Sequence, residues 1–153
     1  MPVVRVYVPV GRDDLEHLVA SGVLAAGPGT PREGYAVTSG LEEAAVGHDL
    51  DDLEYAAFSD AVAASGRRRS TPSDRRVVVS ADAAPEWVVP REGEPVTRVV
   101  LMADLPLARI ASFHIDEDAA ASGAAGEAVG EGEADDLLWY DVTEFDDVRE
   151  LLG

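Results

Sequence analysis

Hydrophobic and polar residues alternate along six short stretches of this chain, and alternation with a period of two is typical of β-strands. The stretches cover residues 3–8, 34–38, 76–82, 98–104, 108–115 and 137–142. Elsewhere, apolar residues spaced three or four positions apart predict helices. The predicted helices cover residues 12–21, 49–64 and 143–152, with a shorter helical turn at 41–45 and a weaker helix around 117–129.

The order of these elements predicts an α+β fold. Strands alternate with helices except in the middle of the chain, where three predicted strands follow one another. Such an order favours a mixed, largely antiparallel sheet of about six strands with helices packed on it. A ferredoxin-like sandwich is one way to arrange these elements. With 153 residues, the chain is expected to form a single domain, residues 1–153.

Two of the predicted strands repeat a seven-residue phrase with five identical positions. One copy runs from Arg76 to Asp82 and the other from Arg98 to Asp104. In each copy the arginine and the aspartate share one face, and valine and alanine side chains form the other. The 15-residue connection contains three prolines, which oppose a crossover helix, so we predict an antiparallel pair. That pairing would place each arginine opposite the aspartate of the other copy, and strand 108–115 is expected beside the second copy.

The charge of the chain is strongly negative. Thirty acidic residues against 12 arginines give a net charge of −18, and lysine, asparagine, glutamine and cysteine are absent. Residues 110–153 alone contain 13 acidic residues and one arginine. Within them, residues 116–136 hold eight carboxylates, four glycines and no basic residue, so a mobile acidic segment is expected near 117–136.

This charge limits the partners that the chain can bind. A negative field repels nucleic acid and anionic membranes, so neither is expected as a partner, whereas a basic protein is favoured electrostatically. No stretch approaches the roughly 18 apolar residues of a membrane span, and residues 1–10 lack the layout of a secretory signal. The absence of cysteine excludes disulfides and thiolate chemistry. We therefore expect a cytoplasmic protein without a cofactor; the oligomeric state stays open.

Five segments of the chain are distinctive in combination. They are RVYVP at 5–9, LEYAA at 53–57, RRVVVSAD at 75–82, PLARIASFHIDE at 106–117 and LLWYDVTE at 137–144. Together they resemble a family of small acidic proteins of unassigned function from high-GC Gram-positive bacteria, the actinobacteria. The resemblance covers most of the chain. It implies a bacterial, cytoplasmic, uncharacterised protein and transfers no active-site residue.

Carboxylates at strand ends are the first candidates for chemistry. His114 and Asp116 are two positions apart and share a strand face, which suits a metal-ligand pair or a base with its orienting group. Asp82, Asp104 and Asp141 also end predicted strands, and clustered carboxylates can bind Mg²⁺ or Mn²⁺. Aspartate is equally a common turn former and helix cap, and we favour that interpretation.

A second set combines polar and aromatic residues. Arg5 and Tyr7 share the polar face of the first strand, and Glu54 interrupts the apolar face of helix 49–64. These three could fix the packing or line a pocket, and packing is favoured. Trp139 and Tyr140 point to opposite faces, so one is expected in the core and the other under a helix or at a pocket rim. The candidate pocket residues are therefore Arg5, Tyr7, Glu54, His114, Asp116, Trp139 and Asp141.

Five of the twelve arginines cluster within ten residues. Such a cluster could bind phosphate, or it could neutralise the acidic surface of the protein itself, and the second interpretation is favoured. The clustered residues are Arg67, Arg68, Arg69, Arg75 and Arg76.

Three functional hypotheses follow. Phosphate loops, dinucleotide fingerprints, HExxH and nucleophile elbows are absent from the sequence, which favours a non-enzymatic binding or regulatory protein with a basic protein partner. The alternative is a metal-dependent enzyme that uses His114, Asp116 and Asp141. A third hypothesis is an acidic mimic of nucleic acid that occupies a basic protein.

Overall fold

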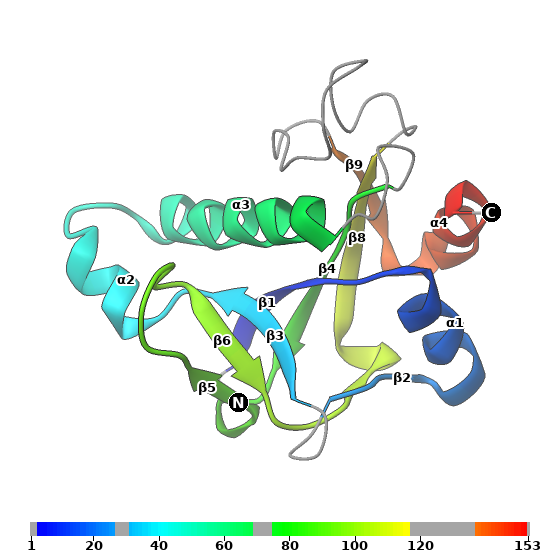
Figure 1. Ribbon diagram of the computed structural model, residues 1–153, viewed down its shortest axis with the longest axis horizontal. Helices are drawn as coiled ribbons and strands as arrows, with labels where there is room; N and C mark the ends of the chain where they lie inside the picture. The colour runs from blue at the N-terminus through cyan, green and yellow to red at the C-terminus, as the bar shows by residue number, and fades with distance from the viewer. Residues whose placement is uncertain (1–2, 27–30, 69–74, 117–136, 153) are drawn as a thin grey trace.

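The computed structural model describes residues 3–26, 31–68, 75–116 and 137–152, and a seven-stranded sheet is its main feature (Figure 1). The strands of this sheet are β1 (Val4–Pro9), β3 (Arg32–Ala36), β4 (Val77–Ala83), β5 (Val88–Pro90), β6 (Arg98–Leu101), β8 (Ile110–Asp116) and β9 (Leu137–Asp141). A two-stranded sheet pairs β2 (Val23–Leu24) with β7 (Leu105–Pro106). The α-helices are α1 (Arg12–Ser21), α2 (Ser39–Ala44), α3 (Leu50–Arg68) and α4 (Phe145–Leu152).

The strands lie in the order β5-β6-β3-β1-β4-β8-β9, and every neighbouring pair runs antiparallel. The predicted α+β class with a largely antiparallel sheet is therefore confirmed. Each of the six predicted strands is present, and β5 adds a seventh within the proline-rich connection. Proline is tolerated there because Pro90 ends a short strand at the edge of the sheet.

Helices cover both faces of the sheet because both faces carry apolar side chains. On β4, Val77 and Val79 pack into the cluster that includes Leu15 of α1 and Val148 of α4. Val78 points the other way and packs with α3. In Figure 1, α1 and α4 lie side by side, and α3 lies along the opposite face. The structure therefore has three layers, with helices on both faces of the sheet, whereas a ferredoxin-like sandwich has two layers.

The two copies of the seven-residue repeat are not neighbours, so the predicted pairing between them is wrong. β3 and β1 lie between β6 and β4, and β8 pairs with β4 and β9 rather than with β6. The strand-end carboxylates accordingly have other partners: Asp82 pairs with Arg5, and Asp104 accepts a hydrogen bond from the Ala26 amide. The prolines do oppose a crossover helix, but the connection forms a 3-10 turn and β5 instead.

The helix ends of the structure lie close to the ends predicted from local sequence signals. α1 covers the predicted range, and Gly22 ends it with a φ of 77°, a left-handed conformation that glycine adopts without strain. The last helix, predicted from residue 143, begins at Phe145, because Asp141 caps a 3-10 turn (Val142–Glu144) that precedes it. In the part of the chain that the structure describes, no helix has the length and apolarity that a membrane crossing requires.

Candidate functional site

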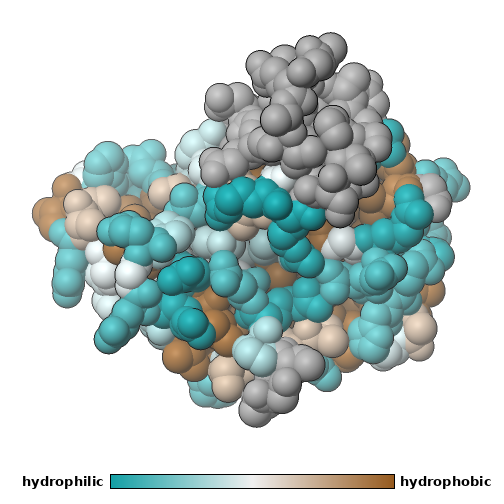
Figure 2. Space-filling model, viewed as in Figure 1, coloured by the Kyte–Doolittle hydropathy of each residue, from teal (hydrophilic) through white to brown (hydrophobic). Residues whose placement is uncertain are grey.

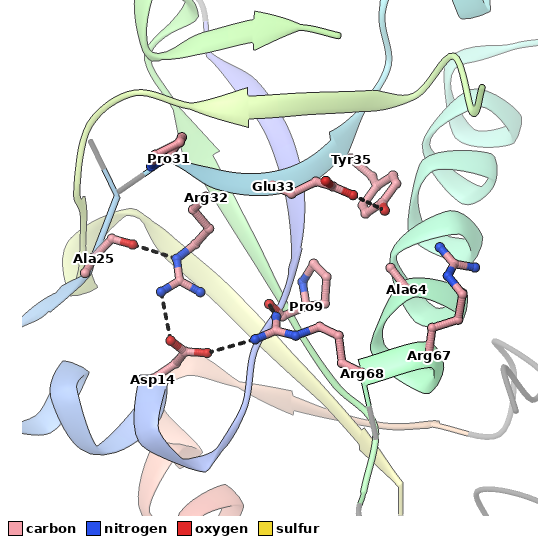
Figure 3. A pocket seen from close by; sticks show the side chains of 10 residues that line it. All are labelled: Pro9, Asp14, Ala25, Pro31, Arg32, Glu33, Tyr35, Ala64, Arg67 and Arg68. Carbon is pink, nitrogen blue, oxygen red and sulfur yellow. Dashed lines mark hydrogen bonds and ion pairs between the residues drawn. The ribbon is translucent and has the colours of Figure 1, made fainter. Parts of the chain in front are cut away.

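A pocket of about 660 Å³ lies where the end of β1, the start of β3, helix α1 and the last turns of α3 meet (Figure 3). We call it the arginine pocket because three of its ten lining residues are arginines, which come from two distant segments of the chain. Figure 2 shows strongly hydrophilic residues gathered on this face of the molecule around the end of α3. The lining residues are Pro9, Asp14, Ala25, Pro31, Arg32, Glu33, Tyr35, Ala64, Arg67 and Arg68.

One carboxylate holds two of these arginines in place. Arg32 Nη2 donates to Asp14 Oδ1 at 2.8 Å, and Arg68 Nη2 lies 3.7 Å from Asp14 Oδ2. The Gly11 amide also donates to Asp14 at 2.8 Å. Burial alone would raise the pKa of Asp14, but the hydrogen bonds from Arg32 and Gly11 and the charges of Arg32 and Arg68 lower it overall. Asp14 is therefore ionised at neutral pH, and two guanidinium groups share its single negative charge.

Backbone carbonyl groups fix the same two arginines. Arg32 Nε donates to the Ala25 carbonyl at 2.6 Å, and Arg68 Nη1 donates to the Pro9 carbonyl at 2.5 Å. Figure 3 shows both guanidinium groups turned toward Asp14 at the base of the pocket, with Arg67 on the α3 side. A guanidinium held by several hydrogen bonds loses little further freedom when it binds an anion.

The opposite wall is formed by a tyrosine and a glutamate of β3. Tyr35 is buried, and its hydroxyl donates to Glu33 Oε1 at 2.8 Å. Burial, together with this bond and the charge of Glu33, raises the pKa of Tyr35 to about 12. The phenol is therefore protonated across the physiological range and serves as a donor.

The charges that line the pocket have the opposite balance to the chain. Among the lining residues that the structure describes, the three arginines Arg32, Arg67 and Arg68 outnumber the two carboxylates, Asp14 and Glu33. The chain as a whole carries a net charge of −18. The pocket is therefore a local cationic site in a strongly acidic protein.

Four of the seven candidates from the sequence lie together elsewhere, on the face of the sheet that α3 covers. Arg5 Nε donates to Asp82 at 2.8 Å. Burial and the nearby charge of Glu54 raise the pKa of Tyr7 to about 12, so Glu54 and Tyr7 are close in space. Phe58 of α3 joins Tyr7 to His114, with ring centroids 5.7 Å and 4.7 Å away. Arg5, Tyr7, Glu54 and His114 thus lie in one region of the structure, where the ion-pair partner of Arg5 is Asp82.

Two serine hydroxyls surround the ring of His114. Ser80 Oγ and Ser112 Oγ lie 3.0 Å and 3.2 Å from His114 Nε2. Burial, and to a smaller extent the positive charge of Arg5, lowers the pKa of His114 to about 4. The imidazole is therefore neutral at physiological pH, and its Nε2 atom forms hydrogen bonds with both serine hydroxyls.

The remaining candidates have separate surroundings. Asp116 is completely buried in an ion pair with Arg76, at 2.7 Å between Asp116 Oδ1 and Arg76 Nη2. Asp141 accepts hydrogen bonds from the amide and hydroxyl of Thr143 and caps the following turn. Among the residues that the structure describes, no group of three carboxylate or histidine side chains is placed to hold a metal ion.

Trp139 and Tyr140 are neighbours on β9, and their side chains have different surroundings. Tyr140 packs against the core, as expected for one of the two aromatic side chains. Trp139 is exposed on β9 and is not among the described residues that line the pocket, so its predicted place under a helix or at a pocket rim is not found. Residues 117–136, in which a mobile acidic segment was predicted, lie outside the described part of the chain, as does Arg69 of the arginine cluster.

Comparison with known proteins assigns the chain to a family. Residues 4–148 match the model of DUF6912, described as a family of unknown function. The chain belongs to this family. No curated protein and no solved structure gives a match. The expected membership of a family without an assigned function is confirmed, and the actinobacterial origin stays a prediction.

Sequence reasoning missed most of the arginine pocket in this DUF6912 member. Asp14, Arg32 and Tyr35 carry no recognisable motif. Arg67 and Arg68 did stand out as part of a cluster, for which phosphate binding was the less favoured interpretation. The missing information was the contact between β3 and the end of α3, because no spacing in the sequence relates these two segments.

Proposed function

We propose that this DUF6912 member is a non-enzymatic binding protein and that the arginine pocket takes a small organic anion, a metabolite bearing a phosphate or carboxylate group. The observation that carries the proposal is the meeting of Arg32, Arg67 and Arg68 at one pocket of about 660 Å³. Cavities of about 300–1,000 Å³ are typical of small-molecule sites. Guanidinium groups bind phosphate and carboxylate with two parallel hydrogen bonds.

The electrostatic balance of the site supports an anionic ligand. Arg32 and Arg68 share the charge of Asp14, and Arg67 adds a third cation on the same rim. Like charges that lie close together repel one another, so the arrangement is favourable when an anion joins them. A bound anion would neutralise the excess charge and accept hydrogen bonds from groups that are already oriented.

The side chains of the pocket support binding rather than catalysis. Its described lining contains no serine, histidine or cysteine that could act as a nucleophile or a general base near neutral pH. Its carboxylates are engaged, Asp14 with Arg32 and Glu33 with Tyr35. Tyr35, with a pKa of about 12, keeps its proton.

Titration calorimetry with a panel of sugar phosphates, nucleoside monophosphates and dicarboxylates tests the proposal. We expect at least one class to bind, and Arg67→Ala to weaken it about tenfold to a hundredfold, the effect of losing a hydrogen bond to a charged group. Arg67 is exposed, so the fold should tolerate its removal. Arg91→Ala is the matched control, because Arg91 is also exposed and lies at the end of β5, outside the pocket.

Two outcomes would contradict the proposal. Absence of heat with every anion class in the wild-type protein would exclude a ligand of this kind. An equal loss of affinity in Arg67→Ala and Arg91→Ala would show that the anion responds to the overall charge of the protein rather than to the pocket.

A further inference from the structure

Four aromatic side chains lie along a path from helix α3 to the edge of the sheet. The centroids of Tyr55 and Phe58 are 6.4 Å apart, and those of Phe58 and His114 are 4.7 Å apart. His114 and Trp139 are direct partners across the antiparallel pair of β8 and β9, so their side chains are adjacent on one face. We call this row of Tyr55, Phe58, His114 and Trp139 the aromatic strip.

Both ends of the aromatic strip are open to solvent. Tyr55 is 50% exposed and Trp139 is 61% exposed, in a chain with only nine tryptophan, tyrosine and phenylalanine residues. Trp139 lies on β9, which is the last strand of the sheet and has β8 as its neighbour. Exposed tryptophan and tyrosine side chains are the residues most often found at the energetic centres of protein interfaces.

Carboxylates border the aromatic strip. Asp51 lies one helical turn before Tyr55, Glu54 precedes it, and Asp141 shares the strand face of Trp139. Asp82 lies across from Arg5 on the neighbouring strand and forms an ion pair with it. His114 contributes no charge at physiological pH because its pKa is lowered to about 4. Among the residues that the structure describes, these four carboxylates give the border of the strip more negative charge than the single charge of Arg5 offsets.

We propose that the aromatic strip is a docking surface for an arginine- or lysine-rich segment of a partner protein. A cationic side chain that lies over an exposed indole or phenol face is attracted by the π-system, and the surrounding carboxylates add to the attraction. A second copy of the same chain fits less well, because each copy carries a net charge of −18 and the border charges would repel. The proposal is independent of the anion site, since the two use different side chains.

The two tryptophans of the chain make a direct test possible. Trp87→Phe leaves Trp139 as the single tryptophan, so its fluorescence reports on the strip alone. Oligoarginine and oligolysine peptides are the probes, and an oligoglutamate peptide of equal length is the control. We expect a saturable change in Trp139 emission with the basic peptides, weakened by added salt, and no change with oligoglutamate.

Variants separate docking on the strip from general attraction to an acidic protein. By calorimetry, Trp139→Ala should weaken binding of oligoarginine about tenfold, the size of one well-placed cation–π contact. Val89→Ala is the control for an exposed apolar residue on the opposite edge strand. Asp51→Asn should weaken binding more than Glu150→Gln, which removes the same charge from exposed α4.

The proposal is overturned if Trp139→Ala binds oligoarginine as tightly as Val89→Ala does, because the peptide would then lie elsewhere. Equal losses in Asp51→Asn and Glu150→Gln would also overturn it. Sedimentation provides a further test: a dimer that dissociates in Trp139→Ala would identify a second copy, rather than a basic partner, as the occupant.

Discussion

Asp116→Asn is expected to lower the free energy of unfolding by about 3–5 kcal/mol, the cost of breaking a buried ion pair by removing one partner. Arg76 and Asp116 are both fully buried, and Asp116 accepts bonds from the Arg76 backbone amide at 2.7 Å and from its guanidinium. Asparagine keeps the shape of the side chain but removes the charge that faces the guanidinium. Urea unfolding of the two proteins measures the difference.

Asp82→Asn is the matched control for this prediction. Its partner Arg5 donates at 2.8 Å, a similar distance, but both side chains are 36% exposed. A pair that water can reach contributes about 0.2–1 kcal/mol, so the control should be destabilised far less. Replacing both members of the buried pair, Arg76→Met with Asp116→Leu, should recover much of the lost stability. Equal effects of the two asparagine variants would refute the role that we assign to burial.

Acidification is expected to destabilise the protein through His114. Its pKa is lowered from 6.5 to about 4 in the folded protein, so the unfolded chain binds the proton more readily. The contribution is fully present above about pH 6.5 and is lost as the pH falls toward 4. A shift of this size corresponds to about 3 kcal/mol. Stability measured by urea unfolding should therefore fall steeply across this range.

His114→Gln isolates this contribution from that of the carboxylates, which also respond to acid. Glutamine is neutral at all pH values and can still form hydrogen bonds with Ser80 and Ser112. The variant should lose less stability than the wild type between pH 6.5 and about 4. His17→Gln, at an exposed position of α1, should follow the wild type. If His114→Gln also follows the wild type, the neutral, half-buried imidazole is not the cause of the pH dependence.

The two proposed sites lie at different parts of the same helix. The first turn of α3 carries Asp51 and Asp52, and its last turn carries Arg67 and Arg68, a distribution that complements the helix dipole. The acidic first turn lies one helical turn before Tyr55 of the aromatic strip. The basic last turn forms one wall of the arginine pocket. A basic partner and a small anion could therefore bind one protein at the same time, without sharing side chains.

The repeat shows where local patterns stop being informative. Alternation correctly predicted that Val77 and Val79 face one layer and Val78 the other. It could not predict that β1 and β3 would separate the two copies, because each strand offers similar apolar faces to several possible neighbours. The predicted partners of Arg76 and Asp82 were wrong for this reason, although both residues do form ion pairs.

For the candidate residues, too, the sequence predicted which side chains share a face but not which distant residues they contact. Arg5, Tyr7 and Glu54 were grouped from their faces alone, and the structure brings them together with His114. Asp116 shares a strand face with His114, but it binds Arg76, which no spacing in the sequence suggests.

The sequence by itself determined the longer elements of this protein, their faces, most helix ends and the excess of negative charge, because these depend on neighbouring residues or on composition. The short strands β2, β5 and β7 were not predicted. Only the tertiary structure decided which strands are neighbours, and with them the arginine pocket and the aromatic strip. Arg32 and Arg68 meet at Asp14, and Phe58 meets His114, across separations of the chain that no local pattern encodes. Such contacts follow from the burial of all apolar faces at once, which is a property of the whole chain.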